Sequence, residues 1–281
     1  MAGFDPRVTP ARADLAAKQL EGKVQAARYV EGRVCEVVEP QAPLRHEPRP
    51  DAPLATEALK GERVTIYDED GEGFGWGQLD SDRYVGWLPM NALRAPGHQP
   101  THKVAALRTI LFPGRSIKAQ PVEGLPLGCR LAVTGDDGQL ARLATGGFVP
   151  VHHLVPLEAA APDFVAVAER FIGVPYLWGG KTSLGIDCSG LVQVALTACG
   201  IPCPRDSDMQ RALGTEVPAG DLAGLRRGDL VFWNGHVAVM RDAATLLHAN
   251  AFHMAVAAEP AREVIERISA AGSEVVAVKR I

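Results

Sequence analysis

The sequence lacks the features that membrane and nucleic-acid-binding proteins need. No stretch of about 18 apolar residues occurs, so no transmembrane helix is expected. The formal net charge is -4, which argues against a general nucleic-acid binder, because such proteins carry a basic surface. The first residues contain no basic segment followed by an apolar run, so we expect no secretory signal peptide.

Cysteine is scarce and shows no paired pattern. The five cysteines are Cys35, Cys129, Cys188, Cys199 and Cys203. An odd number without a framework suits a reducing compartment, so we expect a cytoplasmic protein. The Cys199-x₃-Cys203 spacing is wrong for a typical zinc site and has no partner pair, and we predict neither a metal nor an organic cofactor.

What the sequence does contain is a cysteine at the start of a predicted helix, in Gly185-Ile186-Asp187-Cys188-Ser189-Gly190-Leu191-Val192. Asp187 is a good N-cap, an apolar stripe follows Cys188, and Gly200 and Pro202 end the helix. Unpaired N–H groups and the helix dipole at such a position favour the thiolate. We therefore expect Cys188 to be a nucleophile with a depressed pKa.

Two histidines downstream complete the set that a cysteine hydrolase needs. His236 and His248 each lie in a predicted strand and can supply a base and a group that orients it. A lone histidine on a strand is more often structural, and Asn250 or His253 could take the role of His248. The remaining histidines are expected on the surface or in the β-rich part.

The chain divides into four segments by composition. Residues 1–31 look like an arm with one helix from about Ala11 to Gly22. Residues 32–96 and 101–157 consist of short β-rich runs separated by Gly- and Pro-containing turns. Tyr84–Leu93 resembles Gly146–Leu154, which suggests two small β-barrels. Residues 160–281 change to helical periodicity and then to strands, which is typical of an α+β domain.

The motifs resemble those of the NlpC-type cell-wall peptidases, which are papain-like cysteine enzymes. The matching stretches are Gly173–Gly180, Asp187–Leu191, Pro204–Ser207, Arg227–Phe232, His236-Val237 and His248-Ala249. The family often carries bacterial SH3-like barrels, so the resemblance implies a multidomain protein. It would have two small all-β SH3-like barrels followed by an α+β papain-like cysteine peptidase domain.

The resemblance also implies roles for individual residues. Cys188 would be the nucleophile, His236 the general base and His248 the third polar residue, and Tyr176 would lie near the oxyanion. The residues that would line the dipeptide pocket are Asp187, Ser189, Asp206 and Ser207.

In such enzymes the first barrel also closes the pocket with an acidic residue and a tyrosine, for which Glu47 and Tyr84 are the candidates. Each of these assignments has a plainer alternative. Asp206 and Ser207 precede a short helical run and could serve only as caps. Tyr176 and Tyr84 could be core aromatics, and Glu47 an ordinary surface acid.

The function that the resemblance implies is hydrolysis of a γ-D-glutamyl bond to diaminopimelate or lysine. The substrates would be free peptidoglycan peptides with an unblocked L-Ala, in murein peptide recycling. The expected partner is this small peptide; no protein, nucleic-acid or membrane partner is predicted. The alternatives are a secreted hydrolase of intact wall, an inactive peptide-binding module and a lipid or acyl transferase on the same fold.

Overall fold

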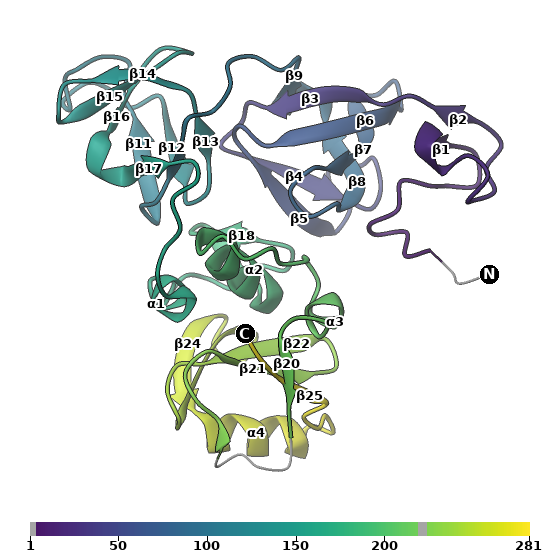
Figure 1. The fold of residues 1–281 in the computed structure, drawn as a ribbon, viewed down its shortest axis with the longest axis vertical. Helices are drawn as coiled ribbons and strands as arrows, with labels where there is room; N and C mark the ends of the chain where they lie inside the picture. Colours follow the sequence, from purple (N-terminus) through teal and green to yellow (C-terminus); the bar gives the residue numbers. More distant parts are fainter. Residues whose placement is uncertain (1–3, 219–223) are drawn as a thin grey trace. The chain divides into compact units, whose positions relative to one another are not determined.

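The computed structural model describes residues 4–218 and 224–281, and the chain divides into two units, 1–157 and 158–281. Figure 1 shows both units, coloured along the sequence. Among the described residues no helix has the length and apolar content needed to cross a membrane.

The amino-terminal unit begins with an arm of turns, bends and two very short strands. It contains β1 (Ala16–Ala17), a single 3₁₀ turn (Lys18–Leu20) and β2 (Tyr29–Val30), which pairs parallel with β1. The predicted helix from Ala11 to Gly22 is therefore wrong. Tertiary contacts override helix propensity here, because Leu15, Ala16 and Ala17 are fully buried and Arg12 stacks over Trp76 and Trp87.

The arm is followed by a seven-stranded antiparallel sheet in the order β5-β4-β8-β7-β6-β3-β9. Its strands are β3 (Arg33–Val37), β4 (Gln41–Arg45), β5 (Leu54–Leu59), β6 (Arg63–Glu69), β7 (Phe74–Leu79), β8 (Val85–Pro89) and β9 (Leu93–Arg94). Alternate residues of β4 and β6 face the core, where Leu44, Val64, Ile66 and Leu88 pack together.

The rest of this unit is built from three small sheets around one core. Its strands are β10 (His102–Val104), β11 (Arg108–Leu111), β12 (Glu123–Pro126), β13 (Arg130–Leu131), β14 (Val133–Asp136), β15 (Leu140–Leu143), β16 (Phe148–Pro150) and β17 (Leu154–Pro156). A strand, a 3₁₀ turn and a short strand recur, with turns at Met90–Ala92 and Val151–His153. The local repeat in the sequence thus has a structural counterpart.

The carboxyl-terminal unit is an antiparallel sheet with helices on both faces (Figure 1). The sheet order is β20-β25-β21-β22-β23-β24. Its strands are β20 (Thr215–Val217), β21 (Asp229–Trp233), β22 (His236–Met240), β23 (Thr245–Asn250), β24 (Ala255–Pro260) and β25 (Ala277–Arg280). A separate hairpin of β18 (Lys181–Thr182) and β19 (Gly185–Ile186) precedes the second helix.

Burial on both faces explains why β21 and β22 read as continuous apolar runs. Leu230, Phe232, Val237 and Val239 pack with α1 (Phe164–Glu169) and α2 (Cys188–Ala198). Val231, Trp233, Ala238 and Met240 pack with α4 (Ala261–Ala270) on the other face. The strand predicted to carry His236 is confirmed as β22, and β25 closes the chain from Ala277.

Candidate functional site

Cys188 is the first residue of α2, and its position is fixed by the Asp187 cap. The Asp187 carboxylate accepts a hydrogen bond from the Gly190 backbone N–H at 2.7 Å, as expected of an N-cap. Gly190 is required for space, because a Cβ there would lie 2.4 Å from the carbonyl oxygen of Gly180. The sequence Asp-Cys-Ser-Gly therefore builds a tight helix start that presents the thiol.

The thiol is less acidic than its place at a helix start suggests. Burial, together with the Asp187 charge, raises the pKa of Cys188 to about 12, although the backbone N–H groups of Val237 and Ser189 lie against the sulfur and lower it. The expected depressed pKa is therefore not found in the free protein, because loss of hydration outweighs the helix end. The resting group is the neutral thiol.

His236 begins β22 directly after a tight hairpin turn. Trp233 and His236 pair across the turn Asn234-Gly235, in which Gly235 has φ +75°. Cys188 packs in the same core cluster as Val237, so the strand that carries His236 lies against the nucleophile. Burial and the nearby His248 lower the pKa of His236 to about 3, which keeps the imidazole neutral and able to accept a proton.

His248 contacts His236 directly. His236 Nε2 and His248 Nδ1 are 2.8 Å apart, so His236 Nδ1 takes no part in this contact. His248 is only 1% exposed, and burial lowers its pKa. Of the alternatives, Asn250 donates to the His248 carbonyl oxygen, and His253 contacts Glu259, so the place beside His236 is taken by His248.

Next to His248 lies the carboxylate of Glu259, which no pattern in the sequence singled out. Glu259 Oε1, on β24, is 2.9 Å from His248 Nε2, and Arg267 of α4 binds both oxygens of Glu259. Burial opposes the charge, but hydrogen bonds from Arg267, His248 and His253 lower the pKa of Glu259 to about 2. In sequence this is one acidic residue among 33, and only the pairing of β23 with β24 singles it out.

Tyr176 is held beside the segment that leads into α2. It forms a parallel bridge with Ile186, and its backbone N–H donates to Met254. Burial, followed by the charges of Cys188 and Asp187, raises the pKa of its hydroxyl to about 12. The hydroxyl therefore stays protonated and can donate a hydrogen bond near the sulfur.

A second feature that the sequence did not reveal is a buried arginine under the helix start. Arg205 is 1% exposed and binds both carboxylate oxygens of Asp187, at 3.0 and 2.7 Å, as well as the Ser189 hydroxyl at 2.8 Å. Asp187 also accepts from the Gly179 backbone N–H. These bonds occupy the Asp187 carboxylate and the Ser189 hydroxyl, so the structure shows both residues bracing the nucleophile.

Asp206 and Ser207 lie at the start of the short helix α3 (Ser207–Gln210), with Asp206 at the N-cap position but without a side-chain cap bond. The fully buried Gln210 ties this segment to α2 by donating to the carbonyl oxygens of Ser189 and Pro204, both at 2.9 Å. Both predicted pocket residues therefore belong to a segment that is docked on the first turn of the Cys188 helix.

Glu47 and Tyr84 lie in the amino-terminal unit, in different settings. The Glu47 side chain is 57% exposed and forms an ion pair with Arg49 at 3.0 Å. Tyr84 is 2% exposed and packs in the core cluster of the seven-stranded sheet. Neither placement tests their predicted part in closing a pocket, and both assignments stay predictions.

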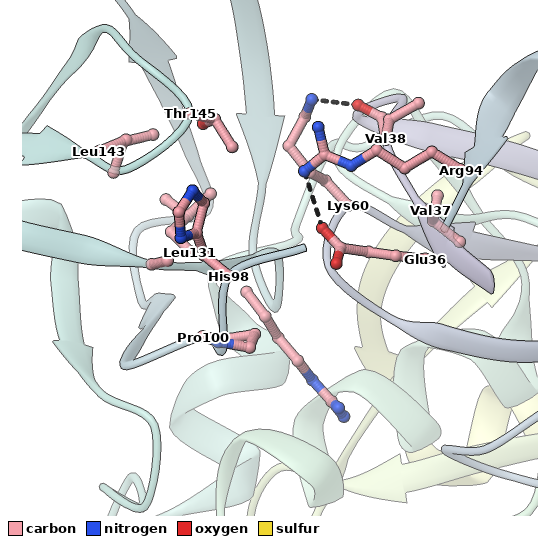
Figure 2. A pocket seen from close by; sticks show the side chains of 12 residues that line it. Glu36, Val37, Val38, Lys60, Arg94, His98, Pro100, Leu131, Leu143 and Thr145 are labelled. Atoms are coloured by element: carbon pink, nitrogen blue, oxygen red, sulfur yellow. Dashed lines mark hydrogen bonds and ion pairs between the residues drawn. The ribbon is translucent and has the colours of Figure 1, made fainter. Parts of the chain in front are cut away.

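A cavity of about 80 Å³ lies within the amino-terminal unit, where β3 and β9 meet the second group of strands. Figure 2 shows two polar contacts in its wall: Glu36 binds Arg94, and Lys60 binds the Val38 carbonyl oxygen. Glu36 also accepts from the Gly97 N–H, and Lys60 pairs with Glu123. Of these contacts, the Lys60–Glu123 ion pair links the two groups of strands.

Comparisons with known families agree with this site. Residues 173–268 match the NlpC/P60 family, and these residues contain Cys188, His236, His248 and Glu259. Residues 173–268 form an NlpC/P60 domain. Residues 44–93 match the bacterial dipeptidyl-peptidase Sh3 domain, which falls on the seven-stranded sheet. The expected family is thereby confirmed, with one SH3-like domain supported and the second SH3-like barrel remaining a prediction.

Curated relatives share both parts. The chain is 30% identical to a gamma-D-glutamyl-L-lysine dipeptidyl-peptidase of Bacillus cereus over 207 residues, which are 64% of this chain and 60% of that protein. It is also 30% identical to the enzyme of the same name from Bacillus subtilis over 199 residues, 65% of each chain. The chain thus spans less than two thirds of the length of these relatives.

A solved structure shares the fold over most of the chain. An NlpC/P60 family protein from Bacillus cereus covers 88% of this chain and 99% of its own, with a TM-score of 0.73 and 23% identity. The combination of β-rich amino-terminal part and NlpC/P60 domain is therefore a fold that has been observed before.

Proposed function

We propose that this protein is a cysteine peptidase that cleaves free peptidoglycan peptides between γ-D-glutamate and the following diamino acid. The observation that carries the proposal is the buried thiol at the start of α2, with the hydrogen-bonded pair His236–His248 on the strands beside it. The names of the two Bacillus relatives support the choice of bond.

The geometry suggests how the chain would perform this reaction. Because both resting groups are neutral, His236 Nδ1 would accept the thiol proton while the sulfur attacks the γ-carbonyl carbon. The oxyanion would be stabilised by backbone N–H groups at the start of α2 and by the Tyr176 hydroxyl.

The intermediate would then collapse with departure of the diamino acid. The C–N bond breaks, His236 returns the proton to the leaving amine, and the L-Ala-D-Glu half remains as a thioester on Cys188. A water molecule that gives its proton to His236 would hydrolyse this thioester and regenerate the thiol.

We further propose that the enzyme takes only peptides with a free L-Ala amine and works in the cytoplasm on recycled murein peptides. A carboxylate that pairs with the ammonium would favour a free terminus, and an acylated terminus would leave that carboxylate unpaired, at a cost of about 2–5 kcal/mol. Asp206 and Glu47 are the predicted carboxylates, and Tyr84 is the predicted wall of the pocket.

The test is to incubate the protein with L-Ala-γ-D-Glu-diaminopimelate, its lysine analogue, their N-acetylated forms and intact sacculi, and to identify products by mass spectrometry. We expect L-Ala-D-Glu from the free peptides and a kcat/KM at least about 100-fold lower after acetylation. Equal cleavage of free and acetylated peptides would favour the secreted wall hydrolase. Binding without cleavage would favour the inactive module.

A further inference from the structure

The hydrogen bonds behind His236 run in one direction because they end on a carboxylate. Ionised Glu259 can only accept, so His248 Nε2, at 2.9 Å, must carry a proton. A neutral imidazole carries one N–H, so His248 Nδ1 must be the acceptor. His236 Nε2, at 2.8 Å, must then donate, which leaves the lone pair on His236 Nδ1.

We propose that Glu259 is a positioning residue that sets the proton arrangement of both histidines, and that Arg267 holds Glu259 ionised and correctly oriented. For its effect on turnover this inference rests on the proposed function. For the proton arrangement it rests on the hydrogen-bond geometry, on the Arg267 contacts that keep Glu259 ionised and on the burial that keeps His248 neutral.

The Glu259 carboxylate is held in place by contacts with several side chains. Arg267 Nη1 lies 2.7 Å from Oε2 and Arg267 Nη2 lies 2.9 Å from Oε1, a two-point contact that fixes the plane of the carboxylate. The Arg267 guanidinium also stacks 4.1 Å from the ring centre of Phe252. Among the described residues, His253 is a further titratable group in contact with Glu259, with its Nε2 atom 3.1 Å from Oε2.

The fold places these groups from three separate elements. In the register of β23 and β24, His248 lies opposite Ala257 and Leu246 opposite Glu259, so Glu259 is the diagonal neighbour of His248 on the same face. Arg267 reaches the same point from α4. The His248 side chain is only 1% exposed, so its contact with Glu259 is shielded from water, unlike an ion pair on the surface.

The arrangement matters because the reaction needs a lone pair at one atom. Without Glu259, His248 could carry its proton on Nδ1, and His236 would then have to accept at Nε2. The His236 proton would then move to Nδ1. In the proposed mechanism this nitrogen accepts the thiol proton, which a protonated Nδ1 cannot do. The Glu259 charge also stabilises the imidazolium that forms on His236 during attack.

The direct test measures proton positions. Long-range ¹H–¹⁵N correlation spectra of the Cys188→Ala protein, labelled with ¹⁵N-histidine, should show Nε2-protonated tautomers for both His236 and His248 at neutral pH. An Nδ1-protonated tautomer at either residue would overturn the proposal. The tautomers can be measured even if the protein cleaves no peptide. A negative result for the proton arrangement is therefore distinct from a negative result for the proposed function.

The kinetic test uses Glu259→Leu, Glu259→Gln and Arg267→Met, with Glu266→Gln as the matched control from an exposed ion pair on the same helix. We expect kcat to fall by about 10- to 100-fold in Glu259→Leu with little change in KM, a smaller loss in Glu259→Gln, and no loss in the control. An amide oxygen can still accept from His248, which explains the partial rescue. Unchanged kcat in a folded Glu259→Leu protein would contradict the inference; should that variant fail to fold, Glu259→Gln and the tautomer measurement decide.

Discussion

Both units bury cysteines, and Cys129 of the amino-terminal unit differs from Cys188 of the carboxyl-terminal unit in what surrounds the sulfur. Cys129 packs among leucines and valines, and its thiol donates to the Pro40 carbonyl oxygen at 3.5 Å. Cys188 has two backbone N–H groups against its sulfur, and a strand carrying His236 packs beside it. Burial raises the pKa of both thiols, so acidity does not separate them. What separates them is that Cys188 begins α2 and packs against the strand that carries His236.

The largest expected effect comes from exchanging the two cysteines for alanine. Cys188→Ala should reduce turnover of the free peptide by about 10⁴-fold or more, because no other group can form the thioester. Cys129→Ala should leave kcat unchanged and lower only the melting temperature. Both are measured by product formation and by thermal unfolding. Retained activity in a folded Cys188→Ala protein would show that the Cys188 thiol is not the nucleophile.

The histidines of the two units are expected to differ in the same way as the cysteines. His236→Ala should cost nearly as much as loss of Cys188, because members of a catalytic unit do not act additively. His248→Ala should cost less, about 10²-fold, because it orients the base without exchanging protons with the substrate. His153 of the amino-terminal unit, bonded to Thr109 at 2.7 Å, is the control, and its alanine variant should keep full kcat. A silent His248→Ala would show that another residue orients His236.

A third comparison concerns arginine–carboxylate pairs. Arg205 is buried on Asp187, whereas Arg94 is 44% exposed where it binds Glu36. Arg205→Met should lower the unfolding free energy by about 3–5 kcal/mol, because it leaves Asp187 buried without its partner. Arg94→Met should cost about 1 kcal/mol or less. Denaturant unfolding measures the free energy of both variants. Similar losses would show that burial of the ion pair does not determine its contribution to stability.

The smallest effect is a dependence of stability on pH. The folded pKa of His236 is about 3, below its ordinary value of 6.5, so the unfolded chain binds a proton between these values that the folded chain does not. The unfolding free energy should therefore fall as the pH drops below about 6.5. Melting curves between pH 7 and 5 should show a shallower fall in His236→Gln. An equal fall would indicate that His236 is not held neutral.

Much of the carboxyl-terminal unit could be predicted from sequence because its signals are local. Asp187 before Cys188, the glycines after it and the apolar stripe specify a capped helix, and a short continuous apolar run specifies β22. The Ala11–Gly22 helix failed for the opposite reason. Its local propensity was overridden by contacts with Trp76 and Trp87, more than 60 residues away in the sequence.

The sequence by itself determined the nucleophile's place at a helix start and the family to which residues 173–268 belong. Only the tertiary structure decided that the thiol rests protonated, because burial depends on what packs around it. It also decided that Arg205 braces Asp187 and that Glu259 backs His248. Glu259 is 11 positions from His248 along the chain, and strand register and α4, which a single sequence does not encode locally, bring the two into contact.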